Sequence, residues 1–95
     1  MQFLVVLRRR IEAFTPDQFA PLMDPEAQAA RGLYQDGFVR QIWSRGDEPG
    51  AVFVVEAADA DEVSRRLHAL PLYAAGMLEA TAITELRPYR GFAPV

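Results

Sequence analysis

Runs of Val, Leu and Phe alternate along the chain with segments in which apolar residues recur at helical spacing. Residues 2–9 and 51–57 are runs of the first kind, which is typical of strands. Val63, Leu67 and Leu70 illustrate the second kind, because positions i, i+4 and i+7 share one face of a helix. The pattern predicts the order β-α-β-β-α-β. The strands are expected at residues 2–9, 38–45, 51–57 and 78–87, and the main helices at about 25–36 and 60–70.

Capping and turn residues mark the ends of these elements. Residues 15–18, Thr-Pro-Asp-Gln, form a helix start, and Pro21 predicts that this first stretch is short or kinked. Residues 24–26, Asp-Pro-Glu, give a second start signal, and Gly37 is a natural stop for the helix that follows. Pro71 is expected to end the second helix, with a loop after it.

The predicted order of elements is that of the split βαβ, or ferredoxin-like, arrangement. This fold class is α+β: a four-stranded antiparallel sheet carries two helices on one face, and residues 1–95 form one domain. The strands are apolar on both faces, since Phe3 and Val5 alternate with Leu4 and Val6. A sheet of this kind needs a second cover. The simplest is another copy of the chain, which predicts a dimeric α/β barrel with a cavity between the sheet and its partner.

Composition excludes several classes of chemistry and of partner. The net charge of −3 argues against nucleic acid, because duplex binders concentrate positive charge. All ten basic residues are Arg and there is no Cys, so lysine bases, Schiff bases and thiolate sites are excluded. One His argues against a protein-only zinc site, and no cofactor is expected. The opening apolar run is too short to span a membrane, which predicts a cytoplasmic protein without membrane contact.

Glu26 is the one charge among the inward positions of the first main helix. At about 100° per residue it falls inside the apolar arc around Met23 and Ala30, whereas Asp24 and Asp36 lie on the solvent side. A carboxylate in an apolar pocket has a raised pKa and can act as a general base or acid. Alternatively, Glu26 only occupies the first turn of the helix, where it suits the dipole and reaches water.

Residues 37–43 carry an arginine and the only tryptophan of the chain. Arg40, expected in mid-strand, could hold a substrate carboxylate in two parallel hydrogen bonds, or could form a structural salt bridge to Glu56. Glu56 itself could serve the site or only pair with Arg. Trp43 could wall a ligand pocket, although tryptophan more often fills a core or an interface.

Other polar and aromatic residues offer weaker signals. His68 titrates near neutrality, but on its helix it falls well away from the apolar centre and is expected to face solvent. The arginine run at residues 8–10 is expected to be solvated, although one of the three could draw an anionic substrate to a cavity mouth. Tyr73 and Tyr89 could line a pocket or simply pack.

Taken together, these positions resemble the muconolactone Δ-isomerase family from Glu26 onward, over about two-thirds of the chain. That family has an acidic residue at the position of Glu56 and an aromatic at that of Tyr73. The resemblance implies ferredoxin-like chains that pair through their sheets and assemble into larger rings. It also implies a cofactor-free reaction that moves a double bond in an unsaturated lactone bearing a carboxylate. The matching positions are Glu26, Ala30, Leu33, Gly37, Arg40, Trp43, Val54, Glu56, Leu67 and residues 70–72, Leu-Pro-Leu.

Three features depart from the family pattern. The isomerases carry a His in a turn where this chain has Asp47 and Glu48, and another His at the position of Gln41. Residues 87–94 also differ from the polar tail of the isomerases. These differences point to a substrate other than muconolactone itself, and they do not argue against membership of the family.

The resulting hypothesis is a cofactor-free isomerase that moves a proton and a double bond in a small, anionic, unsaturated lactone or ketone. Glu26 is the expected base, and Arg40 or an arginine of residues 8–10 is expected to bind the anion. Trp43 and Tyr73 would wall the pocket. The alternatives are a cofactor-free monooxygenase or cyclase, which the absence of Asn weakens, and a non-catalytic small-molecule-binding or structural dimer.

Overall fold

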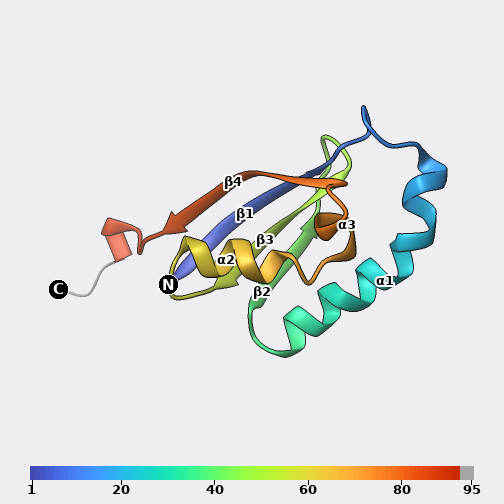
Figure 1. Cartoon of the computed structure of the whole chain (residues 1–95). Helices are drawn as coiled ribbons and strands as arrows, with labels where there is room; N and C mark the ends of the chain where they lie inside the picture. The colour runs from blue at the N-terminus through green and yellow to red at the C-terminus, as the bar shows by residue number, and fades with distance from the viewer. Residues whose placement is uncertain (93–95) are drawn as a thin grey trace.

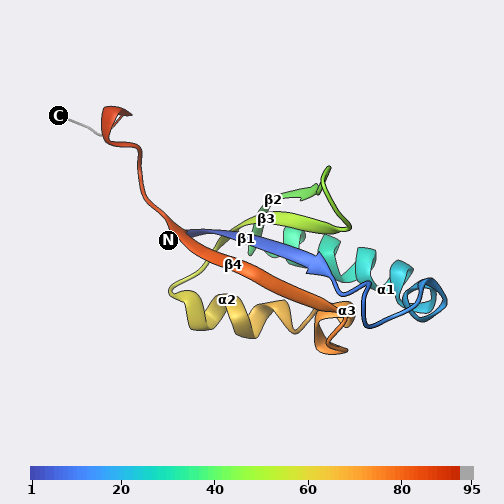
Figure 2. The same ribbon diagram turned by 90° about the horizontal axis from the view of Figure 1, so that it is seen from above.

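The computed structural model describes residues 1–92 and confirms the ferredoxin-like arrangement (Figure 1). Its four strands form one antiparallel sheet in the order β2-β3-β1-β4, so β2 and β4 are the edges (Figure 2). Residues 93–95, the end of the expected single domain and of the divergent tail, lie outside the described part. The elements are β1 (Gln2–Arg9), α1 (Pro16–Gln35), β2 (Val39–Ser44), β3 (Gly50–Glu56), α2 (Ala60–Leu67), α3 (Pro71–Ala74), β4 (Leu78–Leu86) and the 3₁₀ turn η1 (Arg90–Phe92).

The core lies between the sheet and the helices, on one side of the sheet only. Alternate residues of β1, namely Phe3, Val5 and Leu7, are at most 4% exposed and belong to the same cluster as buried residues of α1, α2 and α3. Because side chains alternate across a strand, Leu4 and Val6 point to the opposite face, where they stay half-buried. We call this second side the outer face. Burial of the first face against helices is the main stabilising term, at about 25 cal/mol per Å² of apolar surface.

Helix α1 is one continuous element, so the predicted break between residues 15–18 and 24–26 is wrong. Thr15 caps it with a full capping box, and Pro21 and Pro25 both lie inside it. Each proline removes one backbone hydrogen bond, which bends the helix (Figure 1) but does not end it. Phe19 and Leu33 are buried near its two ends. Packing at both ends therefore outweighs the local cost of the prolines.

Pro71 begins a helix rather than closing one, which corrects the expected loop. Helix α2 ends at Leu67 with His68 as its C-cap, and Pro71 occupies the first position of the short helix α3. Proline suits that position because its missing N–H would be unpaired there in any case. Leu70 and Leu72 on either side of Pro71 are almost fully buried. Burial of these two leucines fixes α3 against the core, next to α1.

The β2–β3 hairpin is held at its turn by two local devices. Arg45 donates two hydrogen bonds to the Asp47 carboxylate, of 2.9 and 2.7 Å, and this contact lowers the pKa of Asp47 to about 2. Gly50 has a positive φ of 155°, and a Cβ built on it would stand 2.1 Å from the Leu7 carbonyl oxygen. Only glycine lets β3 approach β1 this closely at the start of the strand.

Candidate active site

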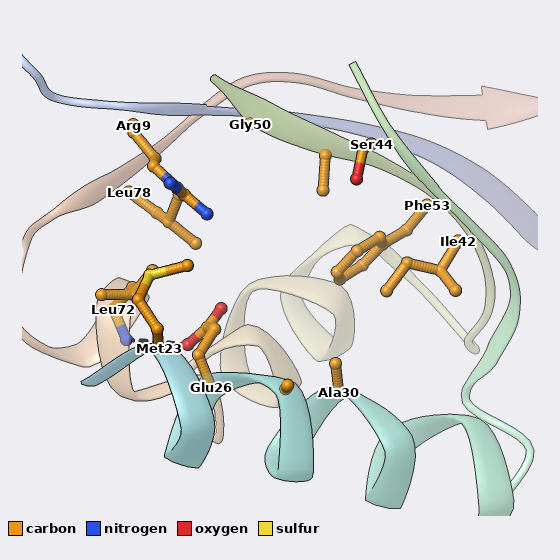
Figure 3. Close-up of a pocket in the computed structure, with 12 residues that line it drawn as sticks. Arg9, Met23, Glu26, Ala30, Ile42, Ser44, Gly50, Phe53, Leu72 and Leu78 are labelled. Carbon is orange, nitrogen blue, oxygen red and sulfur yellow. Dashed lines mark hydrogen bonds between the residues drawn. The ribbon is translucent and has the colours of Figure 1, made fainter. Parts of the chain in front are cut away.

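Glu26 lies on the face of α1 that meets α3 and the sheet. The Leu72 backbone N–H, at the start of α3, donates a 2.9 Å hydrogen bond to Glu26 Oε1 (Figure 3). Burial raises the pKa of the Glu26 carboxyl above its usual value, while the Leu72 N–H and the charge of Arg9 oppose that rise. Of the two alternatives for Glu26, the structure therefore agrees with the half-buried carboxylate rather than with a fully solvated one.

A cavity of about 210 Å³ opens in front of the Glu26 carboxylate. The cavity predicted between the outer face and a partner stays a prediction, and this one lies between α1 and the helix-covered face of the sheet. The reason is that α1 presents Ala27 and Ala30 toward β2 and β3, and such small side chains leave space below the helix. The lining residues are Arg9, Met23, Glu26, Ala27, Ala30, Ile42, Ser44, Gly50, Ala51, Phe53, Leu72 and Leu78 (Figure 3).

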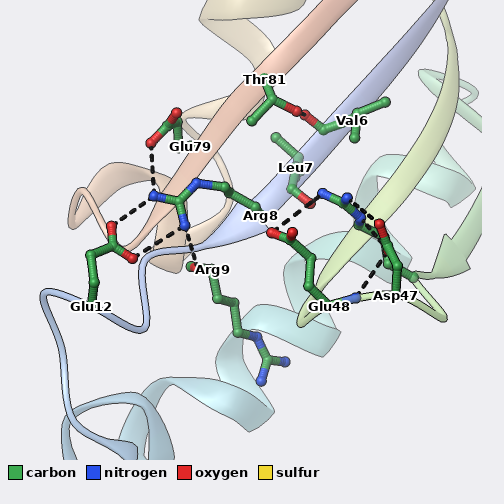
Figure 4. Close-up of polar contacts among 10 residues, drawn as sticks. Val6, Leu7, Arg8, Arg9, Glu12, Asp47, Glu48, Glu79 and Thr81 are labelled. Carbon is green, nitrogen blue, oxygen red and sulfur yellow. Dashed lines mark hydrogen bonds and ion pairs between the residues drawn. The ribbon is translucent and has the colours of Figure 1, made fainter.

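Arg9 is the second charged residue of the cavity lining. It follows Leu7 by two positions on β1, so its side chain leaves the strand on the helix-covered side. Its two neighbours have other partners. Arg8 contacts Glu12 at 2.7 Å (Figure 4). Arg10 donates to the Gly76 carbonyl at 3.0 Å. Among residues 1–92, Arg9 forms no ion pair within 4.0 Å. Of the three arginines at residues 8–10, Arg9 is thus the one available to the cavity.

Arg40 and Trp43 lie outside this cavity. Arg40 sits at a β-bulge between Val39 and Gln41, is exposed, and donates from Nε to the Gly37 carbonyl at 2.8 Å. The bulge interrupts the regular alternation of side chains at Arg40, and the residue does not line the cavity. Trp43 is 63% exposed on the outer face, opposite Val52.

The expected salt bridge between Arg40 and Glu56 is absent from residues 1–92. Glu56 lies at the end of β3, where its Oε2 is 3.2 Å from the N-terminal ammonium of Met1. The ammonium of Met1 therefore takes the place that the sequence prediction gave to the guanidinium of Arg40, as the cation paired with Glu56. Glu56 is not part of the Glu26 cavity lining.

Tyr73 and His68 contact each other away from the cavity. Their rings meet edge to face with centroids 4.9 Å apart, and Tyr73 borders a different, shallow hollow next to Arg10 and Gly76. His68 is exposed, as predicted, and its Nδ1 lies 2.9 Å from the Ser64 carbonyl. Within one chain the structure therefore brings Glu26 together with Arg9, and not with Arg40, Trp43, Glu56 or Tyr73.

Sequence reasoning missed two contributions to the cavity. Ser44 adds a hydroxyl at the end of β2, and the Leu72 backbone N–H orients the carboxylate. The alternation of side chains along β1 could have singled out Arg9, because residues 3, 5, 7 and 9 all point to the same face of the sheet. No side-chain pattern could have found the Leu72 N–H, because any residue except proline supplies that group.

The part of the chain that the structure describes holds no group of three or more His, Cys, Asp or Glu side chains placed to bind a metal ion. Within the same residues, no helix is long and apolar enough to cross a membrane.

The family model described as muconolactone delta-isomerase matches residues 1–90. The chain belongs to this family. The match covers the N-terminal strand as well, which lies before the residues that carried the resemblance in the sequence. A search of curated proteins finds no match.

A solved structure of similar fold is 5-chloro-2-hydroxyhydroquinone dehydrochlorinase from Burkholderia phenoliruptrix AC1100, in complex with 2,5-dihydroxybenzoquinone. It superimposes with a TM-score of 0.69 at 20% sequence identity, and the alignment covers 96% of this chain and 98% of that one. At this identity the likeness establishes the shared fold. The shared fold therefore extends over nearly the whole chain.

Proposed function

We propose that this protein is a cofactor-free enzyme that shifts a proton and a double bond in a small unsaturated lactone or ketone, with Glu26 as the base. The observation that carries the proposal is the state of the Glu26 carboxylate. One oxygen is held by the Leu72 N–H, and the carboxylate faces a cavity with mostly apolar walls. A carboxylate oriented in this way and partly withdrawn from water is a stronger base than a solvated one.

The proposed reaction needs no redox partner. The free oxygen of Glu26 removes a proton from a carbon next to the unsaturated system, and the electron pair spreads onto the substrate carbonyl. The Glu26 carboxylic acid then returns a proton at the other end of the system, so substrate and product have equal mass. Apolar side chains such as Met23 and Phe53 limit the access of water to the reacting carbon.

Membership of the muconolactone Δ-isomerase family supports this class of reaction. The neighbour of similar fold acts, by its name, on a chlorinated hydroxyhydroquinone and was captured with a flat quinone ring. Both names come from the breakdown of aromatic compounds. We infer that the ligand of this chain is a small ring compound of the same general kind.

We also propose that two copies pair through the outer face. This face carries Leu4, Val6, Val52 and Val54, which remain half-buried, and the exposed Trp43. Apolar surface of this extent on an ordinary globular domain favours a partner. Arg40, Trp43, Glu56 and Tyr73 stay predictions as substrate-binding residues, because none of them lines the Glu26 cavity of its own copy.

Muconolactone in deuterated water is the first probe for the reaction. Isomerisation by proton transfer gives a product of unchanged skeleton and altered chromatographic retention, which gains deuterium where the proton on Glu26 exchanges with solvent before its return. Glu26→Gln should lose this activity. A monooxygenase instead adds the mass of oxygen, and a simple binder returns the probe unlabelled. Loss of turnover in His68→Gln, with retention in Glu26→Gln, contradicts the assignment of the base.

A further inference from the structure

Two charged side chains face each other across the cavity without touching. Arg9 enters from the end of β1, and Glu26 enters from α1 on the other side (Figure 3). They form no ion pair, so the space between them is open to a ligand. Between them the walls are apolar, with Met23, Leu72 and Leu78 nearby.

Arg9 has the surroundings of an anion site rather than of a structural ion pair. Its guanidinium lies 5.9 Å from the centre of the Phe19 ring, which gives the planar group an apolar support on one side. An arginine presents donors in a fixed fork that matches the two oxygens of a carboxylate. The nearby acids Glu12 and Glu79 are already paired with Arg8 on the outer side of β1 (Figure 4).

We propose that Arg9 is the subsite for an anionic group of the ligand, and that the bound anion raises the affinity of the Glu26 carboxylate for a proton. This inference rests on the proposed function in using the same cavity, but it concerns binding and can be tested without turnover. The ligand class is a small ring compound that carries a carboxylate or a phenolate. Its anion sits on Arg9 and its ring lies against the apolar walls, toward Glu26.

The coupling follows from the charges that surround Glu26. The elements packed around the carboxylate contribute Met23, Ala27 and Ala30 from α1, Ile42 and Ser44 from β2, Ala51 and Phe53 from β3, Leu72 from α3, Leu78 from β4 and Arg9 from β1. Arg9 is the only charged group among these neighbours. In the free protein its charge lowers the pKa of Glu26 against the effect of burial. An anion on Arg9 cancels that charge and displaces water, and both changes favour the protonated carboxyl.

The consequence is a base whose strength depends on the ligand. Without an anion, the charge of Arg9 offsets part of the effect that burial has on the pKa of Glu26. When the anion binds, the same carboxylate becomes a stronger base, next to the carbon from which a proton is to be removed. A neutral ring compound of the same shape does not form the ionic contact with Arg9, so it does not increase the basicity of Glu26.

Benzoate and its neutral analogue benzamide are suitable probes. Calorimetry in two buffers of different ionisation enthalpy counts the protons taken up, and carbon NMR follows the titration of the Glu26 carboxyl. We expect benzoate to raise the pKa of Glu26 by about one unit, and to bind with uptake of at most about half a proton near the midpoint of this titration. By linkage, its dissociation constant should rise up to about tenfold as the pH increases through this titration. Benzamide should show neither effect.

Matched variants assign the subsite. Arg9→Gln should abolish the preference for benzoate over benzamide, whereas Arg65→Gln, an exposed change of equal charge on α2, should leave it intact. Glu26→Gln should bind benzoate without proton uptake. Circular dichroism and melting of each variant establish that it is folded before binding is compared.

Three results overturn the proposal. The first is wild-type binding of benzoate by Arg9→Gln. The second is binding without proton uptake or a change in the Glu26 titration. The third is no binding of benzoate up to about 20 mM, which is weaker than the millimolar range expected for one charged contact. If Arg40→Gln alone loses benzoate, the subsite belongs to Arg40. Each of these results can occur while Glu26→Gln still abolishes turnover, so the proposed function is judged separately.

Discussion

The two faces of the central sheet are built from the same kinds of residue, yet they differ in what covers them. On the helix-covered face, Val5, Leu7 and Val55 are fully buried, and a cavity remains beside them. On the outer face, Leu4 and Val6 remain half-buried, and Trp43 is 63% exposed. Arginines divide in the same way. Arg8, on the outer side, is bound by two acids, whereas Arg9, one residue later, enters the cavity and has no ionic partner within residues 1–92.

This difference teaches that residue type alone does not assign a role in this chain. The parity of a residue along its strand decides whether it belongs to the cavity or to the surface that we expect to be paired. In our proposals, the covered face serves catalysis and the outer face serves assembly. Changes on one face should leave the property of the other face intact, which can be tested directly.

The largest effect is expected from removal of the base on the covered face. Glu26→Gln keeps an oxygen that accepts from the Leu72 N–H, so the fold and the assembly should persist. Turnover should fall at least ~100-fold, the lower end for a general base. His68→Gln is the matched control, because His68 is exposed and outside the cavity, and it should change turnover by no more than about threefold.

The corresponding change on the outer face is Val52→Asp, which places a charge between Trp43 and Val6. We expect the dimer to weaken by about 30-fold or more, because a charge buried in an apolar contact lacks compensation. Analytical ultracentrifugation checks this, with Ala69→Asp on the exposed α2–α3 connection as the control. A wild-type protein that sediments at 10.6 kDa at micromolar concentration contradicts the pairing itself.

A third change acts at the start of β3, where this strand lies against the end of β1. Gly50→Ala places a methyl group against the Leu7 carbonyl at a backbone φ of 155°. The free energy of unfolding should fall by about 1–3 kcal/mol, the range for backbone strain. Gly46→Ala, in the same hairpin, has open space around its Cβ and should change stability by less than about 0.5 kcal/mol in urea unfolding. Equal effects of the two substitutions would argue against the close approach of the strands.

The smallest effect concerns stability and pH on the covered face. Because the pKa of Glu26 is raised in the folded state, its stabilising contribution is complete below its unfolded value of about 4.3 and is lost as pH rises through the folded value. Glu26→Gln does not titrate. It should therefore melt about 1–3 °C above wild type near pH 7.5 and at nearly the same temperature near pH 4. A difference that grows toward low pH has the wrong sign for a buried carboxylate.

Much of the fold was predictable because its signals are local. The strand composition, Gly37 and the cap at Thr15 each mark an element that the structure contains. Helix α1 was misjudged at Pro25, because the packing that carries a helix through a proline involves residues distant in sequence. The same holds for Pro71, whose role as the start of α3 depends on the burial of its neighbouring leucines.

The candidate site was predictable only in part. The helical phase of Glu26 pointed to its half-buried position, since the phase of a residue in a helix follows from sequence alone. The position of Arg40 did not follow, because a β-bulge shifts the alternation and leaves no clear mark in the sequence. Whether Arg40, Trp43, Glu56 and Tyr73 bind a ligand remains a prediction.

The exposure of Trp43 has a practical consequence. It is the only tryptophan of the chain, and it lies on the outer face, across the sheet from the cavity. Its fluorescence should therefore act as a built-in reporter of one event only. Emission should shift to shorter wavelength when two copies cover the indole, and should hardly respond to a ligand beside Glu26. The emission wavelength, followed as the unlabelled protein is diluted, then gives the association constant of the pair.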